Sequence, residues 1–124
     1  MPDPELIKDI LRQLLEAVGR VERRSAGIGN ANDFVTSDEG IDRLDAICMM
    51  LIAIGESCKH LDKMTDGKLL ARYPSIDWKG VKGIRDIMSH QYFDIDAEVV
   101  FSVCKKHIPE LKTTFEAMLR EWPT

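Results

Sequence analysis

The sequence predicts an all-α protein, a four- to five-helix up-and-down bundle forming one domain over residues 1–124. Three observations lead to this prediction. Apolar residues recur every three or four positions over long stretches, which is the spacing of one helix face. Residues that cap helices, mainly Asp and Ser, stand before several of these stretches. No stretch alternates apolar and polar residues in the manner typical of a half-buried strand.

The first predicted helix begins at Asp3-Pro4, because Asp can accept hydrogen bonds from free amides and Pro fits the first turn. The sequence Glu22-Arg23-Arg24 closes this helix with cations suited to its carboxyl end. Residues 25–37 are rich in Gly and Asn and predict a loop. The apolar face of the helix comprises Leu6, Ile7, Ile10, Leu11, Leu14, Leu15, Val18 and Val21.

The second predicted helix is capped by Thr36 or Ser37 and ends near residues 63–67. More than half of its circumference is apolar, so we expect it to be central or shared with a second subunit. Gly55 lies in its middle, where Gly costs about 1 kcal/mol relative to Ala and can permit close approach of another backbone. The apolar positions are Ile41, Leu44, Ile47, Cys48, Leu51, Ile52, Ile54, Cys58 and Leu61.

Two or three shorter helices are predicted in the second half of the chain. Ser75 and Asp77 are alternative caps for a helix that starts near Trp78. Asp96 caps a further helix, and Pro109 either kinks that helix or starts a fifth segment. The apolar positions are Val81, Ile84, Ile87 and Met88 in the third helix, Val99, Val100, Val103 and Cys104 in the fourth, and Leu111, Phe115, Met118 and Leu119 after Pro109.

Composition excludes some classes of protein and favours others. The net charge of −4 argues against a polycation that binds nucleic acid over its whole surface, so any such contact requires a local basic patch. The three cysteines form no C-x-x-C pair and predict free buried thiols in a reducing cytoplasm. The first residues lack the layout of a signal peptide, and no apolar run approaches the ~20 residues that span a membrane. We therefore expect a cytoplasmic protein with no membrane contact.

The stretch from Arg85 to Tyr92 combines a cation, a carboxylate, an imidazole and a phenol. If the helix persists, Asp86 and His90 share a face, and so do Arg85 and Tyr92. A neighbouring carboxylate orients an imidazole for proton transfer, and Arg offers a fixed fork to phosphate oxygens. These groups could cleave RNA through its 2′-hydroxyl without a metal. Lys79 and Lys82, spaced by three before Arg85, predict a basic strip leading into this site.

Less specific interpretations of these residues remain open. Arg, Asp and His on one helix can form an exposed salt-bridge cluster, and a basic strip can be a solvated face. Glu56, halfway along the second helix, can face solvent or make a polar contact across a dimer. His60, His90 and His107 share no metal-ligand spacing, so we expect no metal site, and we expect no cofactor.

The sequence Arg85-x4-His90-x-Tyr92 resembles the R-x4-6-H-x-Y signature of the HepT-type toxins, which belong to the HEPN superfamily of helical ribonucleases. The resemblance extends in order along nearly the whole chain. Its further segments are Ile54-Gly55-Glu56-Ser57, Pro74-Ser75-Ile76-Asp77-Trp78 and Tyr92-Phe93-Asp94-Ile95-Asp96. Ser57 stands where the family usually has Ala, and Asp86 stands where it often has Asn.

The resemblance implies a bundle that homodimerises, with two motifs meeting at a composite cleft. It implies metal-independent ribonuclease activity carried by Arg85 and His90. It also implies a partner, a nucleotidyltransferase antitoxin of the MNT type, which can transfer AMP to Tyr92. Higher hetero-oligomers with that antitoxin are compatible with this expectation.

Two further hypotheses differ from a ribonuclease toxin. The same bundle could be a non-catalytic nucleotide- or substrate-binding partner of a minimal nucleotidyltransferase, with Arg85 and the basic strip holding phosphate. It could also be a purely structural helical dimer. In the ribonuclease hypothesis, Arg85 binds the scissile phosphate, His90 is the general acid or base, Asp86 orients His90, and Lys79 and Lys82 bind RNA.

Overall fold

The fold was taken from a computed structural model that describes residues 3–91 and 94–122. It confirms the predicted all-α class. In chain order, the elements are α1 (Pro4–Ser25), η1 (Ala31–Phe34), α2 (Asp38–Met64), η2 (Leu70–Arg72), α3 (Trp78–Lys82), α4 (Ile84–Met88), β1 (Ser89–Gln91), β2 (Asp94–Ile95), α5 (Ala97–Ser102), η3 (Val103–His107) and α6 (Ile108–Glu121).

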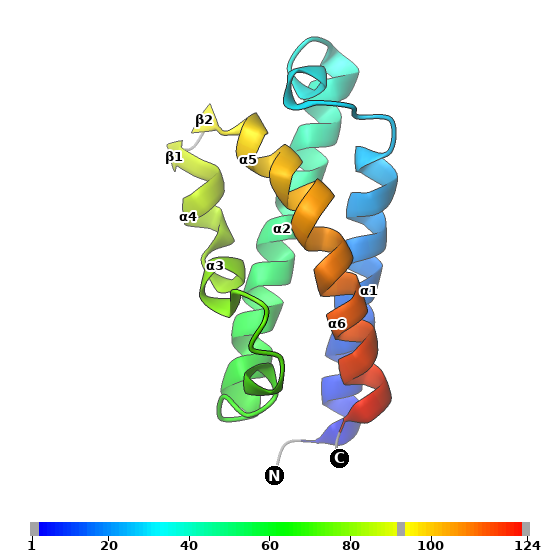
Figure 1. The fold of residues 1–124 in the computed structure, drawn as a ribbon, viewed down its shortest axis with the longest axis vertical. Coiled ribbons are helices and arrows are strands. Elements are labelled where there is room, and N and C mark those ends of the chain that lie inside the picture. The colour runs from blue at the N-terminus through cyan, green and yellow to red at the C-terminus, as the bar shows by residue number, and fades with distance from the viewer. Residues whose placement is uncertain (1–2, 92–93, 123–124) are drawn as a thin grey trace.

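The long helices α1 and α2 form the frame of the bundle, and α6 packs along α1 (Figure 1). The short helices α3 and α4 cross the other side of α2, and α5 leads back over the bundle into α6. None of the described helices is long and apolar enough to cross a membrane. The core consists of the large side chains that are fully buried: Phe34, Phe115, Ile7, Leu11, Leu14, Ile47, Leu51, Ile54, Leu61, Leu69, Ile108 and Met118.

The helix starts follow the predicted capping chemistry. The Asp3 side chain accepts a hydrogen bond from the Glu5 amide at 2.9 Å, and Pro4 occupies the first turn of α1. Asp77, rather than Ser75, caps α3 by accepting from the Gly80 amide at 3.1 Å. These side-chain acceptors satisfy amides that have no partner within their own helix.

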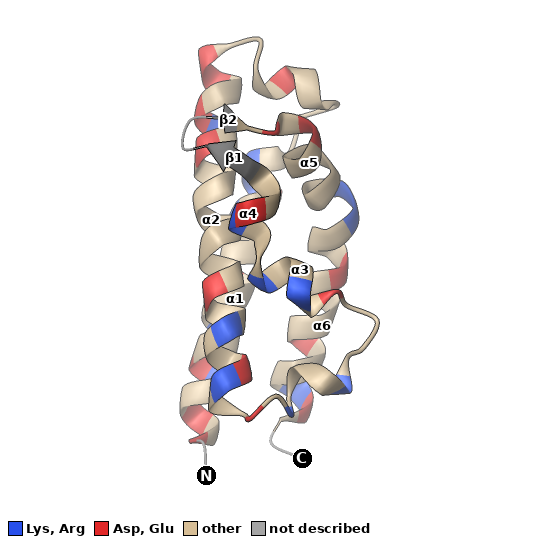
Figure 2. Cartoon of the chain, turned by 90° about the vertical axis from the view of Figure 1, so that its left-hand side faces the viewer, with Lys and Arg blue, Asp and Glu red and all other residues tan. Residues whose placement is uncertain are grey.

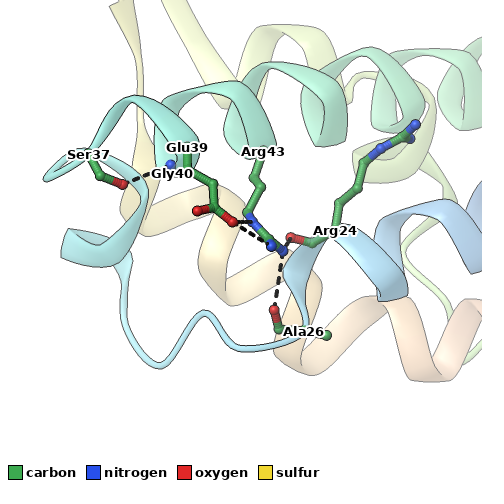
Figure 3. Close-up of polar contacts among 6 residues, drawn as sticks. All are labelled: Arg24, Ala26, Ser37, Glu39, Gly40 and Arg43. Carbon is green, nitrogen blue, oxygen red and sulfur yellow. Dashed lines mark hydrogen bonds and ion pairs between the residues drawn. The ribbon is translucent and has the colours of Figure 1, made fainter.

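One guanidinium fixes the turn between α1 and α2 (Figure 3). Arg43 donates to the carbonyl oxygens of Arg24 at 3.1 Å and Ala26 at 3.4 Å, at the carboxyl end of α1. Glu39 holds the same guanidinium in an ion pair at 2.9 Å. The Ser37 hydroxyl caps α2 by accepting from the Gly40 amide at 3.0 Å. The end of α1 is thus tied to the start of α2.

The second half of the chain departs from the predicted helices in two places. The predicted third helix divides into α3 and α4 at Gly83, and a short antiparallel pair, β1 and β2, follows α4. These strands have three and two residues, too few for an alternating pattern to be recognisable in the sequence. The Asp96 amide then donates to the Met88 carbonyl at 2.8 Å, which closes the hairpin against the end of α4.

The segment around Pro109 forms one continuous helical path with a wide turn. The residues of η3 adopt a π-helix, and α6 begins directly after it with Pro109 in its first turn. Pro is tolerated at that position because its missing amide would have had no helical partner. The structure therefore supports a new helical segment at Pro109, preceded by a π-turn that the apolar pattern did not predict.

Candidate active site

Two contacts hold α3 in place, and α3 in turn positions α4. The Trp78 indole donates to the Tyr73 carbonyl at 3.0 Å, and its ring lies 6.4 Å from that of Phe115 in α6. At the other end of α3, Lys82 forms an ion pair with Asp62 of α2 at 2.8 Å. Both charged side chains are about 30% exposed or less, so the pair lies partly within the fold.

The close approach of backbones predicted at Gly55 is confirmed. A Cβ atom at this position would lie 2.7 Å from the Val81 carbonyl oxygen and 3.1 Å from a methyl group of Ile84. A side chain here would therefore force α3 and α4 away from α2. Gly55 sets the distance between the central helix and the segment that carries the motif.

Arg85, Asp86 and Ile87 are exposed on the single turn of α4. Neither Arg85 nor Asp86 forms an ion pair with another residue that the structure describes, so the predicted alternative of a salt-bridge cluster has no support from α4 itself. Ile87 exposes 47% of its surface beside them. The surface of α4 is a cation, a carboxylate and an apolar side chain, all accessible to a partner or substrate.

The helix ends before it reaches His90. α4 stops at Met88, and the backbone of His90 lies in strand β1. Asp86 and His90 therefore do not share a helix face, and the helical argument that Asp86 orients His90 does not hold. The hairpin hydrogen bond from Asp96 to Met88 explains the change, because it takes up the carbonyl at the end of α4. The same ending removes the helical argument for Arg85 and Tyr92.

Two motif residues fall partly or wholly outside what the structure describes. The backbone of His90 is placed, but its side chain lies outside the described part of the chain. Tyr92 lies outside the described residues altogether. The distances among Arg85, His90 and Tyr92 therefore remain predictions.

The predicted basic strip is not a row of equivalent cations. Lys79 is exposed and forms no ion pair with the described residues, whereas Lys82 is paired with Asp62. The Arg72 guanidinium lies 5.1 Å from the centroid of the Trp122 ring, at the end of the chain the structure describes. Lys79 and Arg85 are the cations of the strip that remain available for phosphate (Figure 2). The sequence gave no signal for the Asp62–Lys82 pair, because its partners are far apart in the chain.

A mainly apolar cavity of about 240 Å³ lies behind α4 rather than at the motif. Ile84 and Ile87 of α4 line this cavity, whereas Arg85 does not. The exposed His107 and Glu110 stand at its edge. The cavity therefore separates the apolar underside of α4 from the charged outer side on which the proposed chemistry depends.

The remaining polar residues raised by the sequence have ordinary surroundings. Glu56 is exposed and lies 3.6 Å from Lys59 on the same helix, and His60 is exposed nearby. Within residues 3–91 and 94–122, no group of three His, Cys, Asp or Glu side chains could hold a metal ion. All three cysteines are free and buried, as predicted. Trp122 is partly buried and packs against the core.

The geometry describes a helical bundle with an exposed cation on a short helix that leads into a histidine-bearing hairpin. Comparison with known proteins identifies the family: residues 14–118 match the family described as "Ribonuclease HepT-like". This match covers most of the chain, and the protein therefore belongs to the HepT-like ribonuclease family. The resemblance noted in the sequence is confirmed at this level.

Individual relatives agree with the family assignment. A Thermococcus cleftensis protein named "Probable ribonuclease HepT" is 32% identical over 111 residues, which are 90% of this chain and 94% of the relative. Two candidate RNases of Methanocaldococcus jannaschii are each 36% identical over 76 residues, or 61% of this chain. The aligned part spans 62% and 60% of those two relatives. No solved structure gives a significant match.

Proposed function

We propose that this protein is a metal-independent endoribonuclease and the toxin of a HEPN/MNT toxin–antitoxin pair. One observation carries the proposal: the sequence Arg85-x4-His90-x-Tyr92 lies inside the region that matches the family, and α4 presents its arginine to solvent. An exposed arginine without an ion pair among the described residues is suited to an anionic substrate. RNA is the substrate class that the family assignment supports.

Arg85 binds the scissile phosphate in this proposal. Its guanidinium stays charged at all physiological pH values and donates two parallel hydrogen bonds to phosphate oxygens. Negative charge grows on these oxygens as the 2′-hydroxyl attacks, so a fixed cation stabilises the transition state more than the ground state. Lys79, exposed on α3, adds a contact to the RNA backbone further along the surface.

His90 transfers protons between the 2′- and 5′-oxygens. An imidazole has an ordinary pKa near 6.5, so it can accept and return a proton near neutral pH. The strand β1 carries His90 away from the axis of α4. Asp86 then acts on the site as an exposed negative charge close to Arg85 in sequence, and no longer as a residue one helical turn from the histidine.

Tyr92 is the proposed site of control. A nucleotidyltransferase antitoxin would transfer AMP to its phenol oxygen and release pyrophosphate from ATP. The adduct adds bulk and negative charge two residues from His90, which would repel RNA by volume and by charge. The protein would act as a homodimer and could form larger assemblies with the antitoxin.

The test is cleavage of a defined single-stranded RNA by the purified protein in the presence of a metal chelator. We expect Arg85→Ala and His90→Ala each to lower the rate by at least ~10²-fold, the usual contribution of such groups. Both variants should keep the helical circular-dichroism spectrum. They should also lose growth inhibition in cells.

Two matched substitutions serve as controls. Arg12→Ala removes an exposed arginine of α1, and His107→Ala removes an exposed histidine of η3, both outside the proposed site. Both controls should cleave RNA at the rate of the unmodified protein. Cleavage that persists in Arg85→Ala and His90→Ala would contradict the proposal, and nucleotide binding without cleavage would favour the non-catalytic binding partner.

A further inference from the structure

One side of α2 is left uncovered by the rest of the fold. At ~100° per residue, its residues fall within about 120° of the helix circumference, between the side covered by α3 and the side covered by α1. We call this surface the α2 strip. Each of its members is exposed or half-buried: Asp42, Asp45, Met49, Ile52, Ala53, Glu56, Lys59, His60 and Lys63.

Charge is distributed unevenly along the α2 strip. Asp42 and Asp45 lie toward the amino end, which is the upper end of α2 in Figure 2, and Lys59 and Lys63 lie toward the carboxyl end. Asp42, Asp45 and Lys63 form no ion pair within the described part of the chain. Met49 lies between these charges with 66% of its surface exposed. The strip thus has an acidic end, an apolar centre and a basic end.

We infer that a second copy of this chain binds the α2 strip, with the two α2 helices antiparallel and the two-fold axis beside Ile52. Asp45 and Lys59 are each seven residues from Ile52, or about 10 Å along the helix axis. Helical periodicity also places both on the same side of the strip as Ile52. A two-fold axis at Ile52 therefore brings Asp45 of each copy opposite Lys59 of the other.

The charges decide between the possible arrangements. In a parallel pair, Asp45 would face Asp45 and Lys59 would face Lys59, and both contacts would be repulsive. In the antiparallel pair, Lys59 also remains 3.6 Å from Glu56 of its own chain, so each lysine lies between two carboxylates. Exposed ion pairs add only about 0–1 kcal/mol each, so burial of Ile52 and Met49 supplies the affinity while the charges set orientation and register.

This arrangement also brings the two motifs together. Ile84 packs on Gly55, and α4 runs antiparallel to α2 (Figure 1), so α4 extends from the level of Gly55 toward that of Ile52. A two-fold axis at that level places both α4 helices on the same face of the dimer. Arg85 of each copy then borders one shared groove. This names the partner of the proposed site, and only its consequence for cleavage rests on the proposed function.

The test uses two charge reversals, separately and mixed. Asp45→Lys places two cations at each contact, and Lys59→Asp places two carboxylates there. Sedimentation should show that each variant alone dimerises at least ~10-fold more weakly than the unmodified protein. An equimolar mixture should regain dimerisation to within ~3-fold of the original, because opposite charges then meet at both contacts. Glu116→Lys, the same charge change on an exposed position of α6, should leave the dimer unchanged.

The outcomes separate this inference from the proposed function. An unmodified protein that is monomeric, or a mixture that stays as weakly associated as its components, overturns the α2 interface. A protein that cleaves RNA as a monomer also overturns it while leaving the proposed function intact. A dimer that follows the charge pattern but cleaves no RNA supports the interface and contradicts the proposed function.

Discussion

Gly55 shows how a single position can control the placement of the motif. A glycine inside a helix is unfavourable on its own, yet this one lets the Val81 carbonyl and the Ile84 side chain approach α2. The cost in helix propensity is therefore offset by the packing of α3 and α4. The sequence indicated the close approach because Gly stands alone within an otherwise apolar stretch.

We predict that Gly55→Ala destabilises the protein by about 1–3 kcal/mol, although Ala is the better helix former. The added methyl group would lie 2.7 Å from a backbone oxygen, which cannot rotate away as a side chain could. Urea unfolding measures the change in free energy. Gly19→Ala is the matched control, because its nearest neighbour there would be Arg23 at 3.7 Å. The control should be neutral or stabilised by up to ~1 kcal/mol, and equal effects at both positions would contradict the packing argument.

At the scale of elements, α3 and α4 are too short to be stable alone and depend on α2 and α6. The five residues of α3 are held at one end by Trp78 and at the other by the Lys82–Asp62 pair. This separates the two lysines of the predicted strip. Lys82 fastens α3 to α2, whereas Lys79 faces solvent.

We predict opposite effects for two equivalent substitutions in α3. Lys82→Gln should lower the free energy of unfolding by roughly 0.5–1 kcal/mol, since its ion pair is only partly exposed. Lys79→Gln should leave stability unchanged but weaken RNA binding and reduce its salt dependence by about one phosphate contact. Urea unfolding and RNA titration at several salt concentrations measure these effects. A loss of stability in Lys79→Gln alone would reverse the assignment.

Sequence periodicity predicted the long elements of this fold well and the short ones poorly. α1 and α2 carry repeated apolar positions and capping residues, so both their existence and their starts could be predicted. The ending of α4 at Met88 depends on a hydrogen bond from Asp96, which no local pattern announces. For the same reason, the motif residues could be named from the sequence, but the relation of Asp86 to His90 could not.

Across the whole molecule, three thiols share one property that links the fold to pH. Burial raises the pKa of Cys58 from its ordinary value of 9.0 to about 12, and it raises those of Cys48 and Cys104 to about 11. The nearby Lys82 lowers the pKa of Cys58 by a smaller amount. These thiols stay protonated in the folded protein at pH values where the unfolded chain would ionise them.

We predict that stability declines as pH rises above about 9, because the unfolded state then releases thiol protons that the folded state retains. Below that pH, both states are protonated and the thiols contribute no pH dependence. Urea midpoints measured between pH 8 and pH 10.5 give the slope. Cys58→Ala should flatten it, and comparison with this variant removes the contribution of other groups. An unchanged slope would show that Cys58 is accessible to water.

The π-turn of η3 has a consequence for changes in chain length. A π-turn accommodates about one residue more than an α-turn, so deleting one residue from Val103–His107 would restore regular winding. The same deletion would rotate α5 by about 100° relative to α6 and shift it by about 1.5 Å. Val100 would leave the core, and the β2 end of the hairpin would move with it. Insertions and deletions should therefore be tolerated far less between Val103 and His107 than in the loop between α1 and α2.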